Sequence, residues 1–151
     1  MNVNDPEVRA LIEEIERLKP WAPPTWRDAH RTIALDFDGV LHDDRDGYTG
    51  ITPEGPPLAG ARDACLDLVA KGYILVVHSC RCSDKEGMEA VAYWLKEHGF
   101  PTMPLTIGKP FAAIYVDDKA YRFTTGPWDG EDIYDITEMY MENAFTFGKY
   151  A

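Results

Sequence analysis

Two aspartates follow a short apolar run in the first third of the chain. Asp36 and Asp38 come directly after residues 33–35, and Gly39 comes next. Such a run is typical of a buried strand, and ligands bind beyond the carboxyl ends of strands in parallel sheets. Two carboxylates there can hold a divalent cation or divide the work of nucleophile and general acid. A strand followed by an ordinary Asp-Gly turn would give the same residues.

Polar side chains follow three further apolar runs in the same way, and each run is interpreted as a strand. These side chains are Ser79 and Arg81 after residues 73–77, Lys109 after residues 105–107, and Asp117 and Asp118 after residues 112–116. The strand ends of a parallel sheet converge on one crevice, so all of these groups are predicted to be neighbours. The adjacent carboxylates of Asp117 and Asp118 repel each other unless a cation or hydrogen-bond donors compensate.

Helical patterns separate the first three predicted strands. Residues 58–71 carry apolar positions at helical spacing before Gly72, and a second helix begins at the capping pair Ser83 and Asp84 and runs to Gly99. This order predicts an α/β fold with a doubly wound, Rossmann-like and mainly parallel sheet of four to five strands. The acidic residues 129–142 predict a closing helix whose charged face is solvated.

The length of 151 residues favours one domain with a substantial core. We expect this domain to span residues 31–151, acidic tail included. Residues 1–30 precede it as an N-terminal amphipathic helix, between residues 5 and 19, and a linker rich in proline and tryptophan. That helix would pack either on its own domain or on a second subunit, which makes a homo-oligomer one possible partner arrangement.

The composition limits the partners that we expect. A formal net charge of −11 opposes a broad nucleic-acid footprint, which needs a basic face to displace counterions from phosphates. The chain has no apolar run long enough to span a bilayer and no signal-peptide pattern at its start, so we expect a cytoplasmic protein without a membrane partner. Three cysteines form no even framework, and reduced thiols are expected.

Taken together, the four strand-end groups resemble the motifs of the haloacid dehalogenase superfamily of phosphohydrolases. The matching residues are Asp36-Phe37-Asp38-Gly39-Val40, Ser79, Lys109 and Asp117-Asp118, in that order along residues 32–123. The spacing between the motifs is filled by the predicted core elements, which leaves no room for the cap domain that this family usually carries. Residues 42–57, here called the flap, are then the only small cover for the crevice.

The resemblance implies a role for each residue. Asp36 would be the nucleophile that forms an aspartyl-phosphate, and Asp38 would protonate the leaving alcohol and then activate water. Asp36, the backbone carbonyl of Asp38, Asp117 and Asp118 would bind Mg²⁺, the implied cofactor. Lys109 would offset the charge of the phosphoryl group as a further catalytic residue. The implied phosphate- or substrate-binding residues are Ser79, Arg81 and Gly39.

Alternatives remain open at several points. Arg81 would contact the substrate or form a salt bridge to the acidic rim of the crevice. His42, close to the first motif, is more typical of a hydrogen-bonded neighbour than of a catalyst. We expect a magnesium-dependent phosphomonoesterase acting on a small phosphate such as a nucleotide. The alternatives are a phosphatase for the 3′ ends of polynucleotides, which the net charge disfavours, and a non-catalytic binding protein on the same fold.

Overall fold

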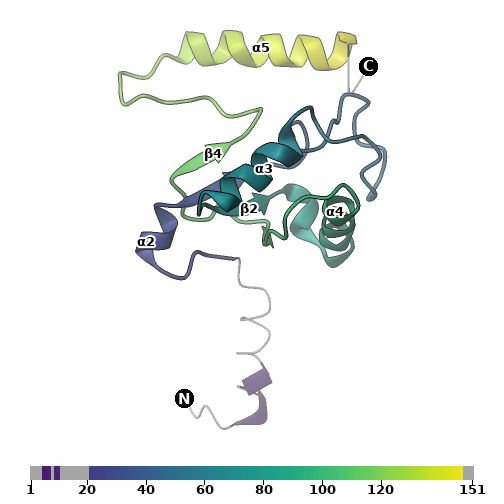
Figure 1. The fold of residues 1–151 in the computed structure, drawn as a ribbon. Helices are drawn as coiled ribbons and strands as arrows, with labels where there is room; N and C mark the ends of the chain where they lie inside the picture. The colour runs from purple at the N-terminus through teal and green to yellow at the C-terminus, as the bar shows by residue number, and fades with distance from the viewer. Residues whose placement is uncertain (1–4, 8, 11–20, 148–151) are drawn as a thin grey trace.

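The sheet of the molecule has four strands, all parallel, in the order β3-β2-β1-β4. A computed structural model describes residues 5–7, 9–10 and 21–147 of the chain. The strands are β1 (Thr32–Leu35), β2 (Ile74–His78), β3 (Leu105–Thr106) and β4 (Ile114–Val116). Helices flank this sheet (Figure 1), so the predicted α/β, Rossmann-like architecture is confirmed. The first and last residues of each strand lie within two positions of those predicted from the sequence.

The chain reverses its direction across the sheet between β1 and β4. It moves outward from β1 to β2 and β3, then returns to pair β4 with the other side of β1. Leu35 of β1 is therefore flanked by Val77 of β2 and Val116 of β4. The backbone N–H of Asp36 donates to the carbonyl of Val116 at 2.9 Å. The residues that follow β1 and β4 consequently lie side by side at the switch point, where ligands bind in such folds.

Two helices cover one face of the sheet. They are α3 (Ala61–Ala70) and α4 (Lys85–Glu97), and both start close to their predicted positions. The side chain of Asp84 caps α4 by accepting from the backbone N–H of Gly87 at 2.7 Å. The main core is formed by the apolar side chains of the strands and helices on this face, including Leu35, Leu75, Val77, Cys65, Val91, Trp94 and Leu95.

Two short helices were not predicted from the sequence. One is α2 (Trp26–Ala29), which precedes β1, and the other is the 3-10 helix η1 (Cys80–Ser83), which follows β2. The hydroxyl of Thr25 caps α2, and the hydroxyl of Ser79 caps η1. Single-turn helices carry too few apolar positions to show a period, so their caps were the sole available signal. The η1 turn brings Arg81 back toward the strand ends.

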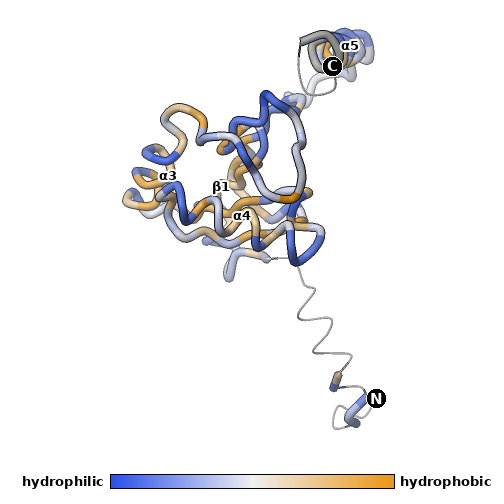
Figure 2. Tube along the Cα trace, turned by 90° about the vertical axis from the view of Figure 1, so that its right-hand side faces the viewer, coloured by the Kyte–Doolittle hydropathy of each residue, from blue (hydrophilic) through white to orange (hydrophobic). Residues whose placement is uncertain are grey.

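The predicted acidic helix forms as α5 (Gly130–Phe147), which is longer than expected at its C-terminal end. It lies apart from the sheet (Figures 1 and 2), and Met139 and Tyr140 are about half exposed, at 52% and 51%. The expected closing contact with the core is therefore not seen for these side chains. Tyr140 instead donates its hydroxyl to the carbonyl of Asp118 at 3.1 Å. The helix is thereby attached beside the end of β4.

Between β1 and α3 the chain forms isolated bridges from His42 to Asp38 and to Pro57, and the described residues contain no inserted cap domain. Most of the helix predicted between residues 5 and 19 lies outside the described residues, as does any oligomer contact through it. In the part of the chain that the structure covers, no helix is long and apolar enough to cross a membrane.

Candidate active site

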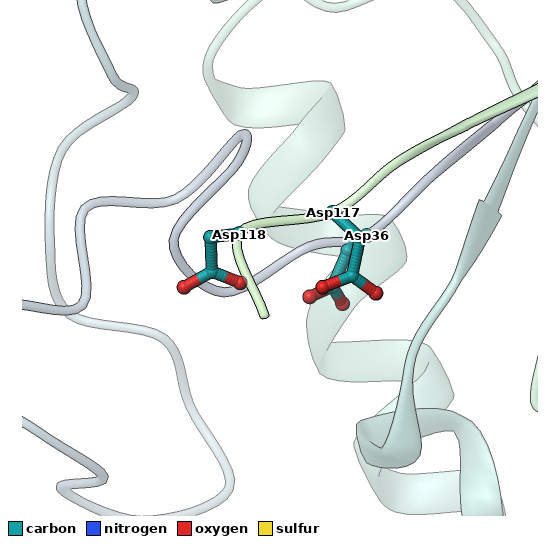
Figure 3. A group of neighbouring side chains, drawn as sticks. All are labelled: Asp36, Asp117 and Asp118. Atoms are coloured by element: carbon teal, nitrogen blue, oxygen red, sulfur yellow. The ribbon is translucent and has the colours of Figure 1, made fainter. Parts of the chain in front are cut away.

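Three carboxylates meet at the switch point between β1 and β4. Asp36 follows β1, while Asp117 and Asp118 follow β4, and one oxygen from each lies within 4.8 Å of the others. Figure 3 shows that the carboxylates of Asp36 and Asp117 point the same way from neighbouring chain segments, with Asp118 beside them. Carboxylate oxygens are the ligands that Mg²⁺ prefers. This three-aspartate cluster is therefore a candidate site for a divalent cation.

The cluster strongly perturbs the ionisation of Asp36. Burial of its side chain and the nearby charges of Asp117 and Asp118 raise the pKa of Asp36 to about 6, from an ordinary value of 3.8. A hydrogen bond from the backbone N–H of Phe37, at 2.8 Å, acts in the opposite direction but does not offset the rise. The three carboxylates thus carry more negative charge than their protein neighbours neutralise, and a bound cation would relieve this.

Asp118 carries an independent sign of a missing partner. Its Oδ1 atom is buried and makes no hydrogen bond to any described residue, whereas its Oδ2 atom lies 3.1 Å from the Nζ atom of Lys119. Buried polar atoms normally have a partner, and a metal ion is one way to supply it. The number of carboxylates, their spacing and this orphaned oxygen all fit a divalent cation such as Mg²⁺.

Gly39 allows the first motif to approach Asp118 closely. Its φ is +80°, in the left-handed region, and a Cβ at this position would overlap the carboxylate of Asp118. Only glycine meets both demands without strain. Gly39 thus helps to shape the cluster, and its contact with substrate stays a prediction.

Asp38, two positions after Asp36, has a very different environment. Its Oδ2 atom accepts from the Nε atom of Arg81 at 2.7 Å, and its Oδ1 atom lies 2.8 Å from the Nδ1 atom of His42. Burial alone would raise the pKa of Asp38, but the hydrogen bonds from Arg81 and His42 lower it below the usual value. Asp38 is consequently a carboxylate held by two donors, Arg81 and the flap residue His42.

Arg81 connects Asp38 to the flap. Its side chain is 6% exposed, and its Nη1 atom donates to the carbonyls of Gly50 and Ile51, at 3.1 Å each. The Tyr48 ring lies 4.9 Å from the guanidinium carbon. Of the two roles considered for Arg81, the structure contains an ion pair, and its partner is Asp38 itself. These contacts fix the flap over the acid that the first motif provides.

The other predicted residues are placed less closely around the cluster. Ser79 is buried at the end of β2, and its hydroxyl accepts from the backbone N–H of Arg81 at 3.2 Å, which leaves its proton free to donate. The Nζ atom of Lys109 lies 4.5 Å from the ring centre of Tyr115, on β4. Lys119, in contrast, contacts Asp118 of the cluster.

One residue near the site, Lys119, was not assigned a role by sequence reasoning. Lys119 directly follows Asp117 and Asp118, and its charge opposes the rise in the pKa of Asp36. The position of Lys119 directly after two aspartates was the feature of the sequence that could have indicated this role. His42 was expected to be a hydrogen-bonded neighbour, and its bond to Asp38 confirms this. Its position four residues after Asp38 did not reveal which atom of the ring makes the bond.

Comparisons with known proteins add little to this geometry. No family model matches the chain, and no curated protein is significantly similar to it. A similar solved structure is described as that of the conserved protein coded by a locus from Bacteroides thetaiotaomicron. It is 20% identical, with a TM-score of 0.48, and the alignment covers 80% of this chain and 99% of that one. This likeness is too distant to support an argument about function.

Proposed function

We propose that the protein is a magnesium-dependent phosphomonoester hydrolase of the haloacid dehalogenase type, with Asp36 as its nucleophile. The observation that carries the proposal is the grouping of Asp36 with Asp117 and Asp118 at the switch point of the sheet. Asp38 supports it, because it follows Asp36 by two residues but has separate hydrogen-bond partners. The site therefore offers a metal-binding carboxylate and an acid–base carboxylate side by side.

The first half of the reaction transfers the phosphoryl group to the protein. A carboxylate oxygen of Asp36 attacks phosphorus, and the bond from phosphorus to the ester oxygen breaks. Asp38, in its protonated form, gives its proton to the departing alcohol. The alcohol leaves, the phosphoryl group remains on Asp36, and Asp38 becomes a carboxylate. The Arg81 and His42 donors stabilise that ionised form.

The second half returns the protein to its starting state. Asp38 accepts a proton from a water molecule as the water oxygen attacks phosphorus, and the bond from phosphorus to Asp36 breaks. Inorganic phosphate leaves, and Asp38 is again protonated. The lowered pKa of Asp38 suits it to this step, in which it begins as a base. The same two donors disfavour the protonated form of Asp38 that the first half of the reaction requires.

The remaining residues assist by charge and hydrogen bonding. Mg²⁺, when held by Asp36, Asp117 and Asp118, would supply positive charge for the phosphoryl oxygens. The Ser79 hydroxyl has a proton available to donate to one of these oxygens. Lys119 already lowers the negative charge of the cluster through Asp118. For Lys109 the proposal requires the side chain to leave the Tyr115 ring, where it now lies.

A small phosphate is the proposed substrate class, with a nucleotide as the leading example. The acidic helix α5 is attached beside the site by Tyr140, and together with the net charge of −11 it would repel a long polyanion. Tyr48 in the flap is 67% exposed and lies against Arg81, so one ring face is available to stack on a base. These features favour a small phosphate over the end of a polynucleotide.

Phosphate release from an aryl phosphate, followed as Mg²⁺ is added to chelator-treated protein, tests the proposal. We expect release that requires Mg²⁺ and is lost in Asp36→Asn but retained in Asp135→Asn, a matched change of an exposed acid on α5. Turnover in the presence of excess chelator, or an active Asp36→Asn variant, would contradict it. Absence of release from aryl, nucleotide, sugar and 3′-oligonucleotide phosphates would favour a binding protein instead.

A further inference from the structure

His42 is buried between the first motif and helix α4. It is 3% exposed, and its ring stacks on Phe37 with centroids 5.2 Å apart and an interplanar angle of 9°. Trp94 of α4 meets the same ring edge-on, at 5.4 Å and 83°. The imidazole is thus held on two sides by aromatic rings, which fixes the directions of its two nitrogen atoms.

The hydrogen bonds of His42 determine which nitrogen carries the proton. The backbone N–H of Gly55 points at Nε2 at 2.9 Å, and a backbone N–H can only donate. Nε2 therefore accepts and carries no proton, which places the proton of the neutral ring on Nδ1. Nδ1 is the atom that lies 2.8 Å from Oδ1 of Asp38, so His42 donates to Asp38.

Gly55, the flap residue behind His42, is itself held in place. Its carbonyl accepts from the indole N–H of Trp94 at 3.0 Å. A Cβ at Gly55 would overlap the carbonyl of Asp43 and press on Nε2 of His42, so no side chain fits there. The contacts form a continuous series from Trp94 through Gly55 and His42 to Asp38. Trp94 and the flap thereby set the direction from which His42 meets Asp38.

We propose that His42 is a positioning residue that holds the Asp38 carboxylate in one orientation for proton transfer. This rests on the function proposed above. Arg81 binds the other oxygen of Asp38, so the carboxylate is fixed at both oxygens. Each carboxylate oxygen accepts about two hydrogen bonds. With the Asp38 side chain 23% exposed, one position on each oxygen remains for the proton that Asp38 gives to the alcohol and later takes from water.

A matched pair of variants separates positioning from a purely structural role. In His42→Asn the side-chain amide places an N–H close to where Nδ1 lies, so the bond to Asp38 is retained while the bond from Gly55 is lost. In His42→Gln the amide reaches the position of Nε2, so an acceptor for Gly55 is retained while the donor to Asp38 is lost. A structural role predicts that Gln is the better replacement, and positioning predicts Asn.

We expect His42→Gln to lower kcat by about 10- to 100-fold with little change in KM, as loss of a charge-assisted hydrogen bond would. His42→Asn should keep a kcat at least about fivefold above that of His42→Gln. Thermal unfolding midpoints establish that both variants fold. Equal kcat values, or a higher value for His42→Gln, would overturn the proposal.

The tautomer in the wild-type protein gives a test that needs no variant and no turnover. Nitrogen-15 NMR of the histidine side chains should show a protonated Nδ1 and an unprotonated Nε2 for His42. The reverse tautomer would overturn the positioning role even if the protein is a phosphatase. If the wild-type protein has the expected tautomer but no Mg²⁺-dependent phosphatase activity, the proposed function is refuted. The catalytic role of the hydrogen bond from His42 to Asp38 is then refuted as well.

Discussion

Asp36 and Asp38 lie two residues apart, yet their surroundings shift their pKa values in opposite directions. Asp36 is surrounded by further carboxylates and has a pKa raised to about 6 by burial and by Asp117 and Asp118. Asp38 is also partly buried, which by itself would raise its pKa, but Arg81 and His42 lower the value below the ordinary one. The difference arises because the two side chains have different neighbours: Asp36 lies with the two aspartates that follow β4, whereas Asp38 contacts Arg81 and the flap residue His42.

This contrast divides the site into two regions with separate tasks. The region between β1 and β4 brings three carboxylates together and is the candidate site for a cation. The region between β2 and the flap surrounds one carboxylate with donors and is complete without a ligand. Environments that push the pKa values of two neighbouring acids apart are how proteins assign them different chemical roles. The predictions below test whether the two regions act separately.

The largest effect is expected from Asp36→Asn. The amide has almost the shape of the carboxylate but is a poor nucleophile, so kcat should fall by at least about 10³-fold while the fold persists. Steady-state phosphate release and circular dichroism measure the two quantities. A kcat within about tenfold of wild type would show that Asp36 is not the nucleophile.

Asp38→Asn should impair turnover by about 10²- to 10⁴-fold, as loss of a general acid–base group does. An aryl phosphate with a good leaving group needs little protonation, so the first step should survive better than the hydrolysis of the phosphoryl-protein. Rapid-quench kinetics should therefore show a burst of phenol followed by slow turnover. Equal slowing of both phases would mean that Asp38 does not act mainly as the base of the second step.

The double variant Asp117→Asn and Asp118→Asn should raise the Mg²⁺ concentration needed for half-maximal activity by at least about tenfold. Without metal, its stability should hold or increase, because the mutual repulsion of the carboxylates is removed with them. Thermal unfolding with and without Mg²⁺ measures this. The exposed pair Asp135→Asn and Glu138→Gln on α5 is the matched control and should change neither quantity. Stabilisation by Mg²⁺ that is unchanged in the double variant would place the metal elsewhere.

The smallest effect is on the pH dependence of stability in metal-free protein. Because the folded-state pKa of Asp36 is about 6 and its ordinary value is 3.8, the folded state keeps a proton that the unfolded state loses between these pH values. The contribution of Asp36 is thus most favourable below about pH 4 and is lost as the pH rises to about 6. The difference in unfolding free energy between wild type and Asp36→Asn should fall across this window.

For Asp38 we expect the opposite change of the unfolding free energy with pH. Its folded-state pKa is lowered, so its contribution to stability is present above the ordinary pKa and is lost as the pH falls through the folded-state value. Wild type should therefore gain stability relative to Asp38→Asn as the pH rises through the acidic range. Chemical denaturation in chelator at several pH values measures both slopes. Slopes of the same sign would remove the distinction between the two regions.

Much of the fold followed from local patterns in the sequence. The apolar runs before Asp36, Ser79 and Asp117 gave the strands, and the cap at Asp84 gave the start of α4. The central strands β1 and β2 are largely buried on both faces, so continuous apolar runs are a strong signal for them, whereas β4 at the edge of the sheet is partly exposed. The rule that ligands bind at strand ends predicts that Asp36 and Asp117 are neighbours, and their carboxylates do lie together.

What the sequence did not predict depends on contacts between distant residues. The pairing of Arg81 with Asp38 requires the η1 turn, whose four residues are too short for a periodic pattern. Lys109 was expected to lie near the three-aspartate cluster, but its side chain lies over the ring of Tyr115. The sequence does not show which of these two neighbours the side chain contacts. The exposed apolar side chains of α5, such as Met139, show that a helical period predicts a helix but not the surface it packs against.

Reductive trapping of the phosphoryl-protein tests the central claim most directly. Wild-type protein is mixed with an aryl phosphate and Mg²⁺, quenched with acid and treated with borohydride, which reduces an acyl phosphate of aspartate to homoserine. Peptide mass spectrometry then locates the change. The account predicts homoserine at Asp36, dependent on substrate and Mg²⁺ and unaltered by Asp135→Asn. Modification at any other carboxylate, or turnover with no trapped residue, would contradict it.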